Sequence, residues 1–231
     1  MLKQRRILLS LSIVIFVLVA TAFTFRVVQF KKTHYKVGSV PPEIVNQLLP
    51  KDVPISSIRP PALRAIDPIR YGGTTSVVSI IEYGDYECEY CRRMRTEIDS
   101  VARSYNGLVR FVWRDFPIEE IHKGSTEVAI FARCAALQGK YWPIHDALMT
   151  AEKLNEKTLQ QIADSFGLDP IFQKSCRQDA AMEQMVLRDL SEARADGINS
   201  APFIFVGTQA FDGYVDAETL RQAVEKAISS T

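Results

Sequence analysis

The chain has 231 residues, of which 47% are hydrophobic and 10% aromatic, enough for one sizeable domain with an insertion or for two small domains. The net charge of +1 hides an asymmetry. Residues 1–36 hold seven basic residues and no acidic one, so the rest of the chain holds 21 basic and 27 acidic residues, a net charge of −6. The acidic body argues against nucleic acid as a partner, and the basic tail indicates a membrane-related segment.

Residues 7–25 form an uncharged, mostly aliphatic run that follows three basic residues. As a helix this run would measure about 28 Å, close to the roughly 30 Å of a hydrocarbon core. The positive flank keeps the N-terminus in the cytoplasm, so the rest of the chain is expected outside it. A signal peptide cleaved after Ala22 is one interpretation. The apolar run continues through Phe25, which favours an uncleaved anchor.

Residues 26–70 are predicted to be a linker, because prolines at this density exclude a regular core. The prolines lie at positions 41, 42, 50, 54, 60, 61 and 68. Within this stretch, residues 43–49 are at most a short amphipathic turn of helix. The folded body is expected to begin near Tyr71.

The body alternates between strand and helix patterns. Strands are predicted at 75–82, 108–116 and 203–206, with a hairpin arm at 209–214. Helices are predicted at 88–105, 125–137, 142–151, 158–166, 170–176, 180–196 and 216–229. Asp216 is a suitable N-cap for the last of them. This order predicts one small α/β sheet with a block of helices inserted into it.

The segment from Cys88 to Cys91 is the strongest functional signal. Two cysteines at this spacing, where a helix begins after a strand, can close a small disulfide. The helix N-terminus favours an anion, so the pKa of the first thiol is expected to fall below its ordinary value of about 8.5. A zinc site is the alternative, but it needs four ligands, and the other cysteines, Cys134 and Cys176, stand singly.

Two further features bear on this chemistry. Glu82 ends a strand predicted to be buried, so desolvation should raise the pKa of its carboxyl and let it exchange a proton with Cys91. The alternative is a solvated acid at a strand end. Cys134 and Cys176 both fall in the helical block, and an even pair in an exported protein predicts a structural disulfide. Two buried free thiols are the alternative.

Four motifs together resemble the DsbA-like thiol–disulfide oxidoreductases. They are Glu82 six residues before Cys88, FVWRDFP at 111–117, QGKYW followed by HD within 138–146, and GINSAPFIFVG at 197–207. The resemblance covers residues 67–231. It implies a thioredoxin-like fold, at 71–118 and 198–231, with an all-helical insertion at 119–197. An N-terminal transmembrane or signal segment at 1–25 precedes it.

The resemblance also implies roles. Cys88 exchanges with substrate, Cys91 resolves the mixed disulfide and Glu82 moves the proton. Pro202 is implied to be cis, so that with Ala201 it presents the substrate backbone; an ordinary trans proline starting an edge strand is the alternative. A membrane quinone-linked partner is implied for reoxidation, and no cofactor or metal.

The sequence departs from the family in two places. Ala201 stands where the family usually has Thr or Val. Glu89 and Tyr90, the residues between the cysteines, replace the Pro-His of its strong oxidants and are expected to contact substrate. The negative charge of Glu89, with Asp85 and Glu87, should raise the pKa of Cys88, while Arg92, Arg93 and Arg95 lower it. The balance predicts a less extreme oxidant.

The sequence therefore predicts an enzyme that introduces disulfide bonds into newly exported proteins. It would act in the periplasm or on the cell exterior face, anchored in the membrane by residues 7–25. A reductase or isomerase for cytochrome or metal-protein maturation is one alternative. A non-catalytic module that binds Cu(I) through two thiolates is another. His122 and His145 receive no predicted role.

Overall fold

The computed structural model describes residues 53–230. The predicted anchor at 7–25, the cleavage after Ala22 and the short turn at 43–49 lie outside the described residues. Across residues 53–230, no helix combines the length and apolar character needed to cross a membrane.

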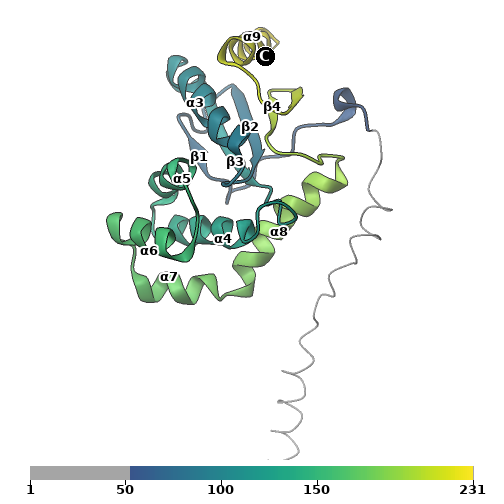
Figure 1. Ribbon diagram of the computed structural model, residues 1–231. Helices are drawn as coiled ribbons and strands as arrows, with labels where there is room; N and C mark the ends of the chain where they lie inside the picture. Colours follow the sequence, from purple (N-terminus) through teal and green to yellow (C-terminus); the bar gives the residue numbers. More distant parts are fainter. Residues whose placement is uncertain (1–52, 231) are drawn as a thin grey trace, which may run out of the picture. The chain divides into compact units, whose positions relative to one another are not determined.

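A five-stranded mixed sheet with the order β1-β3-β2-β4-β5 forms the centre of the described chain (Figure 1). The strands are β1 (Ile69–Arg70), β2 (Val78–Gly84), β3 (Val109–Asp115), β4 (Phe203–Val206) and β5 (Gln209–Asp212). Only the pairing of β2 with β3 is parallel within these residues, and α3 (Glu89–Ser104) supplies the crossover that a parallel pair requires.

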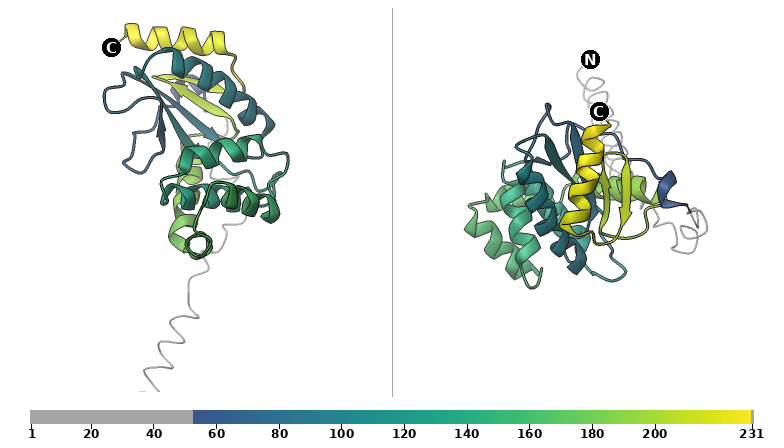
Figure 2. Two further views of the ribbon diagram at one scale, coloured as in Figure 1. Left: turned by 90° about the vertical axis from the view of Figure 1, so that its left-hand side faces the viewer. Right: turned by 90° about the horizontal axis from the view of Figure 1, so that it is seen from above.

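Side chains alternate between the two faces of the sheet, and each face is buried. Ile80 of β2 packs in a cluster with Met94 and Ile98 of α3, whereas the next residue, Ile81, belongs to a second cluster that includes Ile58. Over the first face, α3 and α9 (Ala217–Ser229) lie side by side (Figure 2). The apolar run of β2 is therefore explained by cover on both faces.

The block of helices between β3 and β4 stands beside the sheet (Figure 1). It contains α4 (Ser125–Ala136), α5 (Tyr141–Thr150), α6 (Glu156–Ser165), α7 (Pro170–Arg177) and α8 (Ala180–Ala195). The predicted helix ends agree within two residues, because glycines stop the helices: Gly139, just after α4, has a φ of 70°, which favours glycine. His145 is fully buried in α5, packed edge-on against Trp113.

A disulfide joins Cys134 of α4 to Cys176 of α7 across 42 residues of sequence. A loop of this length predicts a stabilisation of at most about 4 kcal/mol on the chain-entropy estimate. We expect the Cys134→Ala/Cys176→Ala variant to lose about 2–4 kcal/mol of unfolding free energy in urea denaturation, with Cys88 and Cys91 kept oxidised in both proteins. An unchanged urea midpoint would show that the insertion does not depend on this bond.

Residues 53–67, here called the N-terminal strap, pack on the body, although the sequence assigns them to the linker. Ile58 is only 4% exposed and joins the cluster on the second face of the sheet. Just beyond the strap, β1 pairs antiparallel with β3. The strap has one short 3-10 turn, η1 (Ile55–Ser57), and no longer helix. Its prolines permit an extended chain, which can bury isolated apolar side chains without any periodic pattern.

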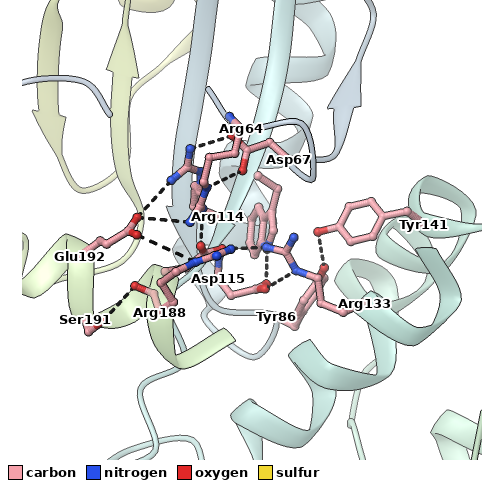
Figure 3. A network of polar contacts seen from close by, with 12 residues as sticks. Arg64, Asp67, Tyr86, Arg114, Asp115, Arg133, Tyr141, Arg188, Ser191 and Glu192 are labelled. Atoms are coloured by element: carbon pink, nitrogen blue, oxygen red, sulfur yellow. Dashed lines mark hydrogen bonds and ion pairs between the residues drawn. The ribbon is translucent and has the colours of Figure 1, made fainter. Parts of the chain in front are cut away.

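A network of ion pairs, buried at its centre and partly exposed at Arg64 and Glu192, joins the strap, the sheet and the insertion (Figure 3). Arg133 of α4 bonds to Asp115 of β3 at 2.6 Å and to Asp189 of α8 at 2.7 Å. Asp189 also bonds to Arg64 of the strap. On the same side, Arg114 of β3 bonds to Asp67 of the strap at 2.7 Å. The network fixes the insertion against the strand end from which the candidate site is built.

Candidate active site

Cys88 lies where the chain leaves the sheet and enters α3. It follows β2, which ends at Gly84, and it is the N-cap residue of α3 with an extended backbone. The residue is 6% exposed, and its sulfur lies 3.4 Å from the carbonyl oxygen of Ala201, to which the protonated thiol can donate a hydrogen bond. The next two residues, Glu89 and Tyr90, are exposed. The N–H groups of the first helical turn therefore face the Cys88 sulfur and favour its anion.

The pKa of the Cys88 thiol is lowered to about 6. The largest cause is a hydrogen bond from the Cys91 side chain; burial acts in the opposite direction, and the backbone N–H groups of Cys91 and Tyr90 lower the pKa further. The charge of Asp85 raises it, in the direction expected from the sequence. At neutral pH Cys88 is thus a thiolate, which can act as a nucleophile and as a leaving group.

Cys91 and Glu82 form the buried side of the site. Cys91 is fully buried, and burial, the hydrogen bond to Cys88 and the charge of Glu82 raise its pKa well above the ordinary value. Glu82 sits in the middle of β2, is fully buried, and has no hydrogen-bond partner for either carboxyl oxygen within residues 53–230. Burial, then the charge of Cys88, raises the pKa of Glu82 strongly. The site therefore holds a protonated carboxyl next to a thiol that resists ionisation.

Pro202 lies across from the cysteines, just before β4. The Ala201–Pro202 peptide bond is cis, and the carbonyl of Ala201 faces Cys88. Ala201 is half-buried and contacts the apolar clusters on both faces of the sheet. The structure thus brings together the two cysteines, Glu82 and the Ala201–Pro202 turn, which are up to 120 residues apart in the sequence.

The lowered pKa of Cys88 can be measured directly. We expect the ultraviolet thiolate absorbance of the reduced protein to rise with a midpoint at about pH 6. In the Cys91→Ala variant the midpoint should rise, since the largest stabilising hydrogen bond is gone. The Cys134–Cys176 disulfide does not titrate and stays intact in both proteins. A midpoint near the ordinary thiol value of about 8.5 would contradict this description of the site.

His122 had no predicted role, and Asp85 and Arg92 were predicted only as charges near Cys88, but all three make specific contacts at the site. Asp85 is buried and hydrogen-bonded to His122, and Arg92 donates to the carbonyl oxygens of Tyr86 and Ala151, which ties α3 to the end of α5. The sequence signal for Asp85 was only its place three residues before Cys88. His122 lies in the loop before α4 and Arg92 near the start of α3, and each bonds to a partner far away in the sequence, Asp85 and Ala151 respectively.

The zinc alternative does not fit the positions of the cysteines. Cys134 and Cys176 are bonded to each other and so do not complete a metal site with Cys88 and Cys91. In the part of the chain that the structure describes, no group of three or more histidine, cysteine or acidic side chains is placed to hold a metal ion. Cys88 and Cys91 therefore receive no further cysteine ligand from the helical insertion.

Comparison with known proteins gives the fold a family. A model of the thioredoxin family matches residues 64–226. A thioredoxin-like oxidoreductase from Silicibacter pomeroyi DSS-3 has a similar structure, with a TM-score of 0.67 and 28% identity over 73% of this chain and 95% of that one. The thiol-disulfide exchange protein alpha-DsbA2 from Wolbachia pipientis has a TM-score of 0.63 at 24% identity, over 70% of this chain and 87% of its own. At this level of identity, the similarity to alpha-DsbA2 establishes a shared fold.

Among curated proteins, the Na(+)/H(+) antiporter NhaA 1 of Mycolicibacterium gilvum is 31% identical over 169 residues. The match covers 71% of this chain but only 27% of the antiporter. The chain thus spans about a quarter of the length of such relatives. The name antiporter refers to those whole proteins and not to the segment that matches this chain.

Proposed function

We propose that this chain, which belongs to the thioredoxin family and has its DsbA-like fold, is a thiol–disulfide oxidoreductase that introduces disulfide bonds into exported proteins. The observation that carries the proposal is the pairing of a stabilised thiolate at Cys88 with a buried, protonated Glu82 behind Cys91. The stabilised thiolate makes Cys88 a good leaving group, and the protonated Glu82 can give a proton to Cys91 when the disulfide between the cysteines breaks.

The reaction begins from the Cys88–Cys91 disulfide. A substrate thiolate attacks the sulfur of Cys88, the bond between the two cysteines breaks, and Cys91 leaves with the electron pair. Because the pKa of Cys91 is raised, it takes a proton, and Glu82 is the buried group that can supply it. A second substrate thiolate then attacks the substrate sulfur of the mixed disulfide, and Cys88 leaves as a thiolate. The substrate is oxidised by two electrons, and the pair is reduced by two.

The lowered pKa of Cys88 supports the oxidising direction of transfer. A lowered pKa at Cys88 stabilises the reduced form, which makes the disulfide a better oxidant. A pKa of about 6 lies between the value of about 7 in thioredoxin and that of about 3.5 in DsbA. The proposal is therefore an oxidant of intermediate strength, in agreement with the acidic residues around Cys88.

The remaining parts of the proposal concern location and partners. Residues 7–25, with their basic flank, support an anchor that keeps the body outside the cytoplasm. The Cys134–Cys176 disulfide supports the same compartment, since structural disulfides persist outside the cytoplasm. Substrates would be newly exported proteins with free thiols, and a quinone-linked membrane protein would reoxidise Cys88 and Cys91.

The test is the equilibrium of the purified full-length protein with glutathione, together with oxidation of a reduced two-cysteine peptide. We expect the oxidised protein to form the peptide disulfide catalytically, and thiol trapping in cells to find Cys88 and Cys91 oxidised. A pair trapped reduced in cells, with a potential near that of thioredoxin, would instead assign the enzyme to reduction or isomerisation.

Glu82 gives a second test of the mechanism. We expect Glu82→Gln to slow peptide oxidation about 10²-fold, because the amide cannot give up a proton to Cys91. The same variant should bind Cu(I) like the wild type, which separates exchange from a copper-binding module. Glu183→Gln, an exposed acid on α8, is the matched control and should keep full activity.

Stability supplies an independent readout for Glu82. Because its folded pKa is raised, its contribution to stability is fully present below the unfolded pKa of about 4.3 and is lost as pH rises through the folded value. Glu82→Gln cannot ionise, so its unfolding free energy should lack this loss at alkaline pH. Equal pH dependence in both proteins would mean that Glu82 is not the buried acid described here.

A further inference from the structure

Arg93 of α3 is held beside the active site by two tyrosine rings. Its guanidinium carbon lies 4.4 Å from the ring centre of Tyr214 and 5.7 Å from that of Tyr90, which is 55% exposed. The hydroxyl of Tyr214 donates in turn to a carboxylate oxygen of Glu97 at 2.8 Å, which fixes the first ring. A free arginine side chain samples many rotamers, and a cation–π contact with a fixed ring restricts them. The guanidinium of Arg93 is therefore pre-organised.

This stack flanks the place where substrate meets Cys88. Tyr214 follows Gly213, whose N–H donates to the carbonyl oxygen of Pro202 at 2.8 Å, so the stack borders the cis-proline turn. Arg93 comes five residues after Cys88, which is a rise of about 7.5 Å along a helix, and helical side chains lean toward the N-terminus. The guanidinium is therefore within reach of the residues that flank a cysteine bonded to Cys88.

The arginines near Arg93 on the same helix are already engaged by the protein. Arg92 donates to the carbonyl oxygens of Tyr86 and Ala151. Arg95 forms ion pairs with two carboxylates, at 3.1 and 3.3 Å. Arg93, by contrast, is exposed and forms no ion pair among residues 53–230. An exposed cation that is held in place next to a reactive sulfur but has no anionic partner is suited to bind an anionic group of a ligand.

The acids nearest to Arg93 on α3 leave its charge available. Glu97, one turn later, accepts the hydroxyl of Tyr214. Glu89, one turn earlier, is exposed and lies outside ion-pair distance of Arg93 in the described chain. The N–H donors of a guanidinium lie in one plane, and a carboxylate binds in that plane through two parallel hydrogen bonds. In a peptide that carries a thiol, a carboxylate is the anion with this geometry.

We propose that Arg93 is a specificity-determining residue that binds a carboxylate of the thiol substrate while the substrate cysteine is bonded to Cys88. The carboxylate comes from an acidic side chain beside that cysteine or from a chain end that follows it. Tyr90 and Tyr214 are positioning residues, because they hold the guanidinium next to the site. The inference rests on the proposed function only for the identity of Cys88 as the reacting thiol, and it names a substrate class: peptides with an acidic group next to the cysteine.

The test uses the Cys91→Ser protein, because its Cys88 can attack a peptide disulfide but cannot be released by Cys91. The Cys88 thiolate bonds to one sulfur of a disulfide-linked peptide dimer, the bond between the two peptide sulfurs breaks, and one peptide leaves as a thiolate. Two such dimers have blocked termini and carry aspartate or asparagine next to the cysteine. A third has the cysteine at a free C-terminus, which distinguishes a terminal carboxylate from that of a side chain.

Mass spectrometry follows the rate at which each adduct forms. We expect the ratio of the rates with the aspartate and asparagine peptides to fall about threefold to fivefold when Arg93→Gln is added. The intrinsic reactivity of each peptide cancels in this comparison. Tyr214→Leu should lower the ratio as well, although it keeps the charge of Arg93, because the guanidinium loses its fixed ring. Lys123→Gln, which removes an exposed positive charge in the loop before α4, is the matched control and should keep the ratio.

The outcomes separate this inference from the proposed function. If the wild type oxidises no peptide while Arg93→Gln still lowers the ratio, the proposed function fails and the role of Arg93 stands. A loss of rate in Arg93→Gln that is confined to the peptide with the free C-terminus would support the role of Arg93 and assign the carboxylate to a chain end. Equal relative rates with and without Arg93→Gln for every peptide, or an equal fall in Lys123→Gln, would overturn the role of Arg93.

Discussion

Cys88→Ser and Cys91→Ser are both expected to reduce peptide oxidation to the uncatalysed rate, because neither can form the Cys88–Cys91 disulfide, but only Cys91→Ser should still trap a disulfide substrate on Cys88 as a mixed disulfide. The two cysteines differ in access and in charge: Cys88 is at the helix N-terminus with a pKa of about 6, and Cys91 is fully buried with a raised pKa. The substrate is therefore expected to bond to the Cys88 sulfur, while Cys91 is the leaving group that the first attack displaces.

Mass spectrometry measures both outcomes in one experiment. Incubation of Cys91→Ser with the disulfide-linked dimer of a one-cysteine peptide should give about one peptide adduct per protein, located at Cys88, while the second peptide leaves as a free thiol; once that thiol is removed the adduct should persist until thiol is added. Cys88→Ser should give none, because Cys134 and Cys176 are held in a buried disulfide in both variants. Unchanged turnover in Cys88→Ser, or an adduct at a cysteine other than Cys88, would contradict the assignment of the nucleophile.

The parts of the site that lie close together in the sequence were predictable. A strand that runs into Cys88 and Cys91 fixes both the helix N-terminus and the order of the two thiols, since the chain must turn there. The depth of Glu82 followed from the apolar residues around it, because a strand covered on both faces buries every side chain. The place of Pro202 beside Cys88 came from the family resemblance, as no local pattern links positions so far apart.

What the sequence did not predict depends on contacts between distant segments. The strap was assigned to the linker because its prolines interrupt any helical or strand periodicity of apolar residues. In the structure, however, Ile58 is buried against the sheet. The bond between Asp85 and His122 joins two loops with no periodicity of their own. Arg133 and Asp189 lie on helices whose amphipathic patterns predict only that one face is buried, and a buried charge there runs against that pattern.

The ion network around Arg133 is expected to make a large contribution to the free energy of unfolding. We expect Arg133→Met to lower the unfolding free energy by about 3–5 kcal/mol, because it leaves the carboxylates of Asp115 and Asp189 buried with a cation missing. Burial already raises the pKa of Asp115, and the charge of Arg133 is the largest influence that lowers it. Methionine keeps the length of the side chain, so the loss reports the charge rather than a cavity. Urea denaturation at neutral pH measures it.

Arg177→Met is the matched control, because Arg177 also makes two short hydrogen bonds to carboxylate oxygens, at 2.7 and 2.8 Å, but both go to Glu156, which is 69% exposed. Water replaces a lost partner at such a site, so the cost should stay within about 1 kcal/mol. Without Arg133 the folded pKa of Asp115 rises further, and a raised pKa gives stability that is present at low pH and lost as pH rises. The deficit of Arg133→Met should therefore shrink in mild acid, while that of Arg177→Met should shrink only once Glu156, whose pKa Arg177 lowers, takes up a proton at lower pH. Equal losses in the two variants at neutral pH would mean that the network owes its stability to packing, and that the insertion is held to the sheet by its apolar contacts alone.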